Sequence, residues 1–475
     1  MHPIARNIHQ LYAADYMERL QQQQRAWLAY NGESPKPLKV RTGQPDDNVQ
    51  VNYARTIVNT GVSFLFGDNI TFSLAQPAGA AAAAGEPREI QWLNQVWAAN
   101  RKMTLLHKFG INGGVTGHGF LKIAPPAAGA RQPFPRLINL DPATVNVIWN
   151  PDDVDLVDVY VIEYTAMQYE RSQRRLMPVN RRQLIERDGS RWVIIDQTAR
   201  LGGDYQDTQA PVYWPYEWAP IIDCQNLPAA NAYYGEPDIP KDILELSRSV
   251  DFVLSNTGRI IRFHAHPKTI GKGFKAADID VGVDGLLCLP NAAADLKNLE
   301  MASDLGSSIV FFEKLKEAIY TASATPEVAT GKVEDLGQIS GVALQVLFRP
   351  LILKTMTKRL LTGDMLVELN RRLLEMGGFA NRETTVGWSQ MLPINALEER
   401  NVLLIDQQLG ASKDSTLDKA GYDPAVEKQK RKEEAKEGRE LGNQMLGAFN
   451  KGQNPDADPD LDDEDDDAGD EGDEA

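Results

Sequence analysis

The chain has little cysteine and no long apolar run. Its 475 residues include only Cys224 and Cys288, whose spacing fits no metal motif and excludes a disulfide framework. We therefore expect two free thiols in a reducing compartment. No stretch of about 18 apolar residues occurs, so no membrane-spanning helix and no membrane partner are expected. The first residues also lack the apolar segment of a secretory signal.

The chain also lacks an excess of positive charge. The formal net charge is −16, and 13 acidic residues with no basic ones lie between Asp456 and Glu474, which leaves −3 on the rest of the chain. A nearly neutral body is not typical of a protein that holds nucleic acid through many phosphate contacts. The acidic tail cannot bury enough apolar area to fold, so we expect it to be disordered. It would act as a solvating segment or as a docking site for basic partners.

Motifs for catalysis and for cofactor binding are missing. The glycine-rich stretch 110–119 lacks the spacing of a phosphate loop and precedes a predicted strand, so we interpret it as a tight turn with glycines at positive φ. Near Thr330 and Lys332, Pro326 stands where a phosphate loop needs glycine. His264 and His266 lack a third ligand and are expected to end a helix. We predict no catalytic residue, no cofactor and no metal site, and we expect no enzyme activity.

The first half of the chain mixes helical and strand-like patterns, which predicts an α+β fold. A chain of this length is expected to form about two to four sub-domains. Helices are predicted at 8–30, at 52–66 with Gly67 as the terminating residue, and at 88–109. Strands are predicted at 70–74, 120–123, 136–149 and 157–166, and a polar segment follows at 167–215.

The second half is mainly helical. One apolar stripe from Ile239 to His264 advances by alternating steps of four and three, which predicts a helix packed against other helices. A second amphipathic helix is predicted at 307–321, after a glycine-rich insertion with short β-like runs at 265–304. A long helix from Gly341 to about Gly377 carries Pro350, where a kink is expected. Then come a strand at 384–392 and helices at 395–409 and 413–447.

A polar loop at 325–340 joins the second helix to the long one. Its side chains are too polar for a core, so the loop should face water or a charged partner. Glycines at its end and centre would act as hinges because glycine reaches backbone angles that other residues avoid. The polar residues of the loop are Thr330, Lys332, Glu334, Asp335, Gln338 and Ser340. The predicted hinge residues are Gly331, Gly337 and Gly341, together with Pro350 in the long helix that follows.

The order of these motifs resembles the portal (head-to-tail connector) family of tailed bacteriophages, most of all its siphophage type. The resemblance lies in Asn52, Ile57-Val58, Val62, Leu65 and Gly67, in Gly117-His-Gly-Phe120, in Gly235-Glu-Pro-Asp-Ile239, in Pro326 with Thr330-Gly331 and Ser340-Gly341, and in the strand before Pro393. No single motif is decisive, whereas the ordered set is specific to the family.

The resemblance implies a division of the chain into the parts of a portal subunit. It assigns 1–237 to the wing, 238–264 and 305–324 to two stem helices, 265–304 to the clip, 325–340 to the tunnel loop, 341–393 to the kinked helix and the return strand, 394–450 to the crown, and 451–475 to the tail. The tunnel-loop residues would line the DNA channel together with Arg248, Arg259, Arg262, Lys314 and Lys316 of the stem.

The function implied by the resemblance is that of a ring of about twelve subunits at one capsid vertex. Double-stranded DNA would pass through it during packaging and ejection. Expected partners are the terminase large subunit, head-completion or adaptor proteins, and the major capsid and scaffolding proteins, in the virion and, during assembly, in the host cytoplasm. Two alternatives are another structural virion protein (a capsid or tail component), disfavoured by the stem–clip–stem order, and a nucleotide-dependent DNA enzyme, disfavoured by the missing phosphate loop.

Overall fold

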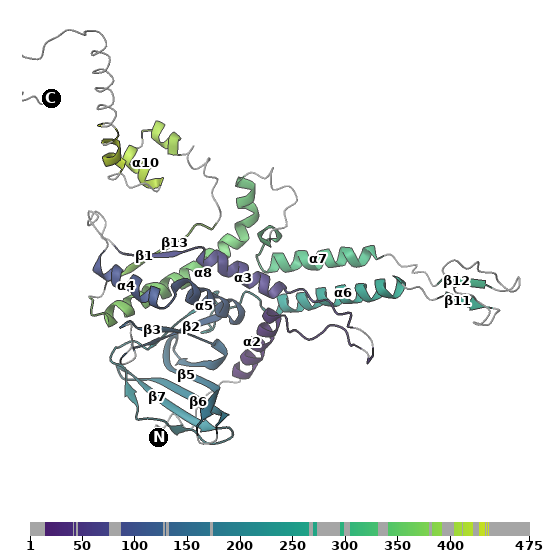
Figure 1. Ribbon diagram of the computed structural model, residues 1–475, viewed down its shortest axis with the longest axis horizontal. Helices are drawn as coiled ribbons and strands as arrows, with labels where there is room; N and C mark the ends of the chain where they lie inside the picture. The colour runs from purple at the N-terminus through teal and green to yellow at the C-terminus, as the bar shows by residue number, and fades with distance from the viewer. Residues whose placement is uncertain are drawn as a thin grey trace, which may run out of the picture. The chain divides into compact units, whose positions relative to one another are not determined.

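The computed structural model describes residues 15–40, 42–43, 46–75, 87–126, 129, 133–171, 174–265, 269–272, 295–298, 305–330, 341–379, 382–391, 403–410, 412–420, 427–432, 434 and 436 (Figure 1). The chain divides into two compact units, 1–392 and 393–475. The first unit combines helices with antiparallel sheets, which confirms the predicted mixture of α and β structure.

Four helices form the N-terminal part of the first unit: α2 (Asp15–Asn31), α3 (Tyr53–Phe66), α4 (Arg88–Ala99) and α5 (Lys102–Thr116). The ends of α3 are determined locally. The Asn52 side chain accepts a hydrogen bond from the backbone N–H of Arg55, and Gly67, at φ 58°, donates its N–H to the carbonyl of Ser63. A polar N-cap and a glycine at positive φ are the expected termination signals, so this helix is predicted correctly.

The predicted single helix 88–109 and the predicted glycine turn 110–119 are both wrong. The helix breaks at Asn100–Arg101, where Arg101 has φ 55°, and α5 then continues through Gly110, Gly113 and Gly114. In this stretch only Gly117 has a positive φ, of 90°. The other glycines serve packing, because a Cβ on Gly110 would lie 2.7 Å from the Phe66 ring. They allow α5 to approach α3 closely.

Two small sheets lie near these helices. In one, β2 (His118–Ala124) is the central strand between β3 (Arg136–Leu140) and β10 (Ile221–Gln225). In the other, β1 (Ile70–Leu74) pairs with β13 (Thr384–Trp388), so that a strand from the end of the unit completes a sheet begun near its start. The predicted strands at 70–74 and 120–123 are confirmed, and the one predicted at 384–392 is present but ends at Trp388.

The largest sheet is antiparallel and follows the short helix η2 (Pro142–Thr144). Its strands are β4 (Val145–Asn150), β5 (Asp153–Glu170), β6 (Arg175–Asp188), β7 (Arg191–Arg200), β8 (Gln206–Asp207) and β9 (Val212–Tyr213). The segment 167–215, predicted only as polar, thus contains long strands. Its polarity reflects the exposed ends of β5 and β6, where residues on both faces contact water.

The large sheet separates two apolar clusters of unequal size. Tyr160, Ile162 and Ile185 belong to the main core of the unit, which also contains buried residues of α3, α4, α5 and α8. Val161 and Leu184 belong to a small second cluster. Alternate residues of a strand face opposite sides of a sheet, so the two clusters lie on opposite faces of the sheet.

The remaining elements of the first unit are mostly helical. They are α6 (Lys241–Ala265), β11 (Thr269–Lys272), β12 (Asp295–Asn298), α7 (Gly306–Ala322), η4 (Glu327–Thr330) and α8 (Gly341–Met376). Helices α6 and α7 lie side by side, and β11 pairs with β12 (Figure 1). Figure 1 also shows α8 bent towards its N-terminal end, the part of the helix that contains Pro350, as predicted.

The second unit is described in part. Helical residues occur at 403–408, in α10 (Lys413–Lys419) and at 427–432. The predicted helix 413–447 begins where expected but is not continuous, because α10 ends at Lys419 and Ala420 is in a turn. The acidic tail lies outside the described residues, and its predicted disorder stays a prediction.

Candidate functional site at the base of the stem helices

Helices α6 and α7, here called the stem helices, bury only part of their apolar surface. Ile243 and Val250 of the predicted stripe on α6 are fully buried. By contrast, half or more of the side-chain surface is exposed at Phe252, Ile261, Ile309, Val310 and Phe311. Large apolar groups are seldom left in water without a partner when they gather on neighbouring elements. The pair therefore offers apolar surface that a single chain does not cover.

A short segment, residues 46–51, lies along α6 and is hydrogen-bonded to it. The Asp47 carboxylate accepts hydrogen bonds from Arg262 Nη1 at 2.6 Å and from Arg259 Nε at 3.1 Å. The backbone N–H of Val49 donates to Ser255 Oγ at 2.8 Å, and Ser255 in turn donates to the carbonyl of Val49 at 3.1 Å. These contacts join residues more than 200 positions apart in sequence, and they hold α6 in a fixed position on the N-terminal helices.

The last contact of this segment involves a buried carboxyl group. Asp251 Oδ1 accepts a hydrogen bond from the N–H of Val51 at 2.8 Å. Burial raises the pKa of Asp251 to about 6, against the opposing effect of that hydrogen bond. The carboxyl group of Asp251 thus titrates near the upper end of the acidic range, whereas an exposed aspartate titrates near 3.9.

A buried group of charges lies where the stem helices meet the rest of the unit. Asp238, just before α6, is bonded by Lys358 and Lys354 of α8, the latter at 3.0 Å. Lys354 Nζ also donates to the carbonyl of Ser323, at the end of α7, at 3.0 Å. The N–H of Asp238 donates to the carbonyl of Gly114 at 2.8 Å. One lysine of α8 thereby contacts the start of one stem helix and the end of the other.

Electrostatics in this group favour the charged carboxylate. Burial opposes ionisation of Asp238, but Lys358 and Lys354 hold its pKa below the ordinary value. Burial lowers the pKa of Lys358, and the Asp238 carboxylate counteracts that effect. Because an unpaired buried charge is costly, each member of the group depends on the others. The group therefore favours a fixed arrangement of α5, α8 and the two stem ends.

The cations predicted to line a channel do not gather at one place in the single chain. Arg259 and Arg262 bind Asp47, as described above. Arg248 lies 3.7 Å from Glu245, Lys314 lies 2.7 Å from Glu317, and Lys316 lies 3.2 Å from Glu327. All five predicted cations thus have a carboxylate close by, and their place in a channel stays a prediction.

Only the two ends of the predicted tunnel loop fall in the described part of the chain. The chain leaves α7 through Ala324, at φ 54°, and continues through the buried Thr325 into η4, which ends at Thr330. Gly341 begins α8. The other predicted loop and hinge residues, Gly331, Lys332, Glu334, Asp335, Gln338, Gly337 and Ser340, lie outside the described residues.

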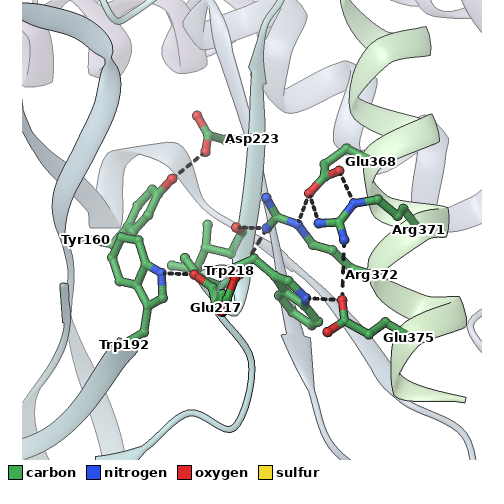
Figure 2. A network of polar contacts seen from close by, with 11 residues as sticks. Tyr160, Trp192, Glu217, Trp218, Asp223, Glu368, Arg371, Arg372 and Glu375 are labelled. Carbon is green, nitrogen blue, oxygen red and sulfur yellow. Dashed lines mark hydrogen bonds and ion pairs between the residues drawn. The ribbon is translucent and has the colours of Figure 1, made fainter. Parts of the chain in front are cut away.

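A second polar network, not predicted from sequence, fastens α8 to the strand region (Figure 2). Arg372 donates to the carbonyls of Ala219 and Ile221 at 3.0 and 2.8 Å and is paired with Glu368 at 2.7 Å. Trp218 Nε1 donates to Glu375 Oε2 at 2.8 Å. The only sequence signal for this network is the Arg- and Glu-rich last third of α8. Such a composition is equally typical of a helix face exposed to solvent.

In the part of the chain that the structure describes, we find neither a group of metal ligands nor a membrane-spanning helix. No group of three or more His, Cys, Asp or Glu side chains converges there as a metal site would require. No helix among the described residues is long and apolar enough to cross a bilayer. Cys224 is a free, half-buried thiol, as expected, and desolvation raises its pKa to about 12. Cys288 lies outside the described residues.

The described part of the chain thus combines paired helices with uncovered apolar surface and buried polar junctions at their base. The sequence was compared with the models of known protein families, and one family matches. The chain matches the family described as phage portal protein, SPP1 Gp6-like, over residues 9–176 and 289–440. The match covers more than half of the chain, so the chain belongs to the phage portal protein family, and the resemblance predicted from motif order is confirmed. No curated protein matches the chain.

Proposed function

We propose that this portal protein assembles into a ring of about twelve copies at one capsid vertex, and that the centre of the ring is the passage for double-stranded DNA during packaging and ejection. The membership in the portal family supports a structural role in the phage head. The finer assignment to a DNA channel rests on the geometry of the stem helices.

The observation that carries the proposal is the uncovered apolar surface of α6 and α7. Phe252 and Phe311 are 50% and 54% exposed, although the helix pair is held at its base by Asp238 and Lys354, and α6 is held near its other end by Asp47. A rigid helix pair with exposed aromatic side chains fits an element that packs against a neighbouring copy. Repetition of the same contact around an axis closes into a ring.

The charge distribution supports a channel that binds DNA weakly better than a site that binds it tightly. The five predicted channel cations have carboxylates near them, and the chain without its acidic tail carries a net charge of only −3. Such a surface would hold a phosphate backbone only weakly, which suits a passage through which DNA must slide. ATP hydrolysis would then come from a separate terminase motor, which docks near the β11–β12 end of the stem, and head-completion proteins would replace it afterwards. Capsid and scaffolding proteins would contact the outer part of the ring.

Assembly is tested by mass photometry and negative-stain electron microscopy of the purified protein. We expect rings with a central hole wide enough for duplex DNA. The double variant Phe252→Glu/Phe311→Glu should shift the population towards monomers, whereas Leu201→Glu, at a more exposed apolar position in the β7–β8 turn, should assemble normally. A protein that stays monomeric at micromolar concentration contradicts the proposal.

Passage of DNA is tested separately at the loop. Gly337→Val with Gly341→Val should reduce the DNA packaged per capsid while the melting temperature of the protein changes little, because glycines that act as hinges would contribute backbone freedom and not packing. Normal packaging combined with early unfolding would show that the loop is a packed structural element.

A further inference from the structure

Strand β5 extends well beyond the strand beside it. β4 pairs with β5 from Asp153 to Ile162 only, whereas β6 pairs with β5 as far as Glu170. Among the described residues, no strand therefore lies beside Glu163–Glu170 on the β4 side. A strand edge of this kind presents backbone N–H and C=O groups spaced to pair with another extended chain.

Three residue types that commonly protect a strand edge are absent from this segment. The segment Glu163–Glu170 contains no proline, glycine or lysine, which are the residues that commonly block edge pairing. It also exposes apolar side chains. Met167 and Tyr169 are 60% and 55% exposed, and Leu176, 59% exposed, lies directly opposite Tyr169 on β6. Directly opposite residues share a face of the sheet, so these side chains form one apolar ladder beside the open edge.

The same end of the hairpin is strongly basic. Between Tyr164 and Arg181 the only acidic residue is Glu170. Arg181 lies opposite Tyr164, and Arg200 lies opposite Val179 on the neighbouring strand. The exposed arginines at this end are Arg171, Arg174, Arg175, Arg181 and Arg200. In a chain with a net charge of −16, this is a local concentration of positive charge.

These three features together define the chemistry of the partner. We propose that the open end of the β5–β6 hairpin is a docking site for an acidic, extended segment of another protein, which adds to β5 as a further strand. The edge requires an extended backbone, the ladder favours apolar side chains at alternate positions, and the arginines favour acidic side chains between them. The chain's own residues 1–14 fit poorly, since they contain Arg6 and no acidic residue. Duplex DNA would leave the apolar ladder and the backbone edge unused.

The first test measures binding of a fluorescent synthetic peptide of alternating glutamate and valine to the full-length protein by anisotropy. Arg175→Glu with Arg181→Glu should weaken binding at least about tenfold, since charge-assisted contacts are lost. The matched control is Arg187→Glu with Arg191→Glu, which makes the same charge change at exposed positions around the other turn of β6. We expect that control to bind as the wild type does. Equal weakening in both variants would show general charge attraction and overturn the proposal.

The second test addresses the backbone edge without altering the protein. A peptide of the same sequence with N-methyl groups on alternate residues cannot donate hydrogen bonds along one side, and we expect it to bind at least about tenfold more weakly. A peptide with the sequence of residues 454–475, which is acidic but lacks apolar alternation, should also bind weakly. Undiminished binding of either peptide, or full competition by duplex DNA, would overturn the proposal.

Discussion

The side-chain nitrogen of Lys354 lies 3.0 Å from Asp238 Oδ1, in a buried pair that connects α8 to the start of the first stem helix. Together with Lys358, this pair concentrates three charges in a region where Asp238 is almost completely excluded from water. The contribution of this group to stability depends on each charge being neutralised by the others, and not on any single hydrogen bond.

Removal of the negative member should therefore be strongly destabilising. Asp238→Asn leaves Lys354 and Lys358 without a counter-charge, and we expect a loss of about 3–5 kcal/mol in the free energy of unfolding. Urea denaturation measures it. Arg248→Met removes an exposed pair with Glu245 and should cost less than about 1 kcal/mol. An unchanged midpoint for Asp238→Asn would mean that the lysines are neutral or solvated.

The carboxyl group of Asp251 should make stability depend on pH in a defined window. Its pKa is about 6 in the folded chain and about 3.9 when unfolded, so the folded state binds more protons between these values. The stability contributed by protonated Asp251 is complete below about pH 4 and is lost as pH rises through about 6.

The variant Asp251→Asn isolates this contribution, because the amide oxygen can still accept the Val51 hydrogen bond. We expect it to gain stability relative to the wild type on the order of 1–3 kcal/mol between pH 4 and pH 7. Urea midpoints of both proteins at the two pH values give the difference. If the difference does not change with pH, Asp251 is not the titrating group.

The glycines of α5 should differ sharply from one another. A Cβ at Gly110 would lie 2.7 Å from the Phe66 ring, whereas one at Gly113 would lie 3.5 Å from its nearest neighbour, Asn226. Gly110→Ala should therefore destabilise by about 1–3 kcal/mol through overpacking. Gly113→Ala should be neutral or stabilising by up to about 1 kcal/mol, since alanine favours the helix. Thermal unfolding of the two variants measures the contrast, and equal effects would contradict the close α3–α5 packing.

Two leucines near Pro350 test the position of α8 within a single chain. Leu351 is fully buried, but Leu347 is 43% exposed. We expect Leu351→Ala to cost about 2–5 kcal/mol and Leu347→Ala to change monomer stability by less than about 1 kcal/mol. Chemical denaturation of dilute protein measures both. A large loss for Leu347→Ala that appears only at assembling concentrations would place that residue at a contact between copies.

Patterns within one element were enough to predict many of the helices and strands. The stripe from Ile239 to His264 predicted α6 almost to its ends, because every residue in it follows the period of one helix. The glycine-rich stretch was misread, since what decides the role of Gly110 and Gly114 is the neighbouring side chain on α3 or before α6. No local pattern contains that information.

The candidate site was even less accessible from sequence. Lys358 and Asp238 are 120 positions apart and Asp47 and Arg262 are 215 apart, so neither partner signals the other along the chain. The exposed cations were identified as charged, but their pairing with nearby carboxylates needed the coordinates. The predicted loop residues from Gly331 to Ser340 lie outside the described part of the chain, and their role stays a prediction.

The double contact of Lys354 has a consequence for how the chain can diversify. Because the carbonyl of Ser323 and the carboxylate of Asp238 meet at the same ammonium group, everything between them leaves and re-enters the body at one point. The cost of closing a loop grows only slowly with its length. The part of this excursion that lies beyond the contacts of α6 with residues 46–51 can therefore be lengthened, shortened or exchanged for that of a relative without disturbing the packing at its base.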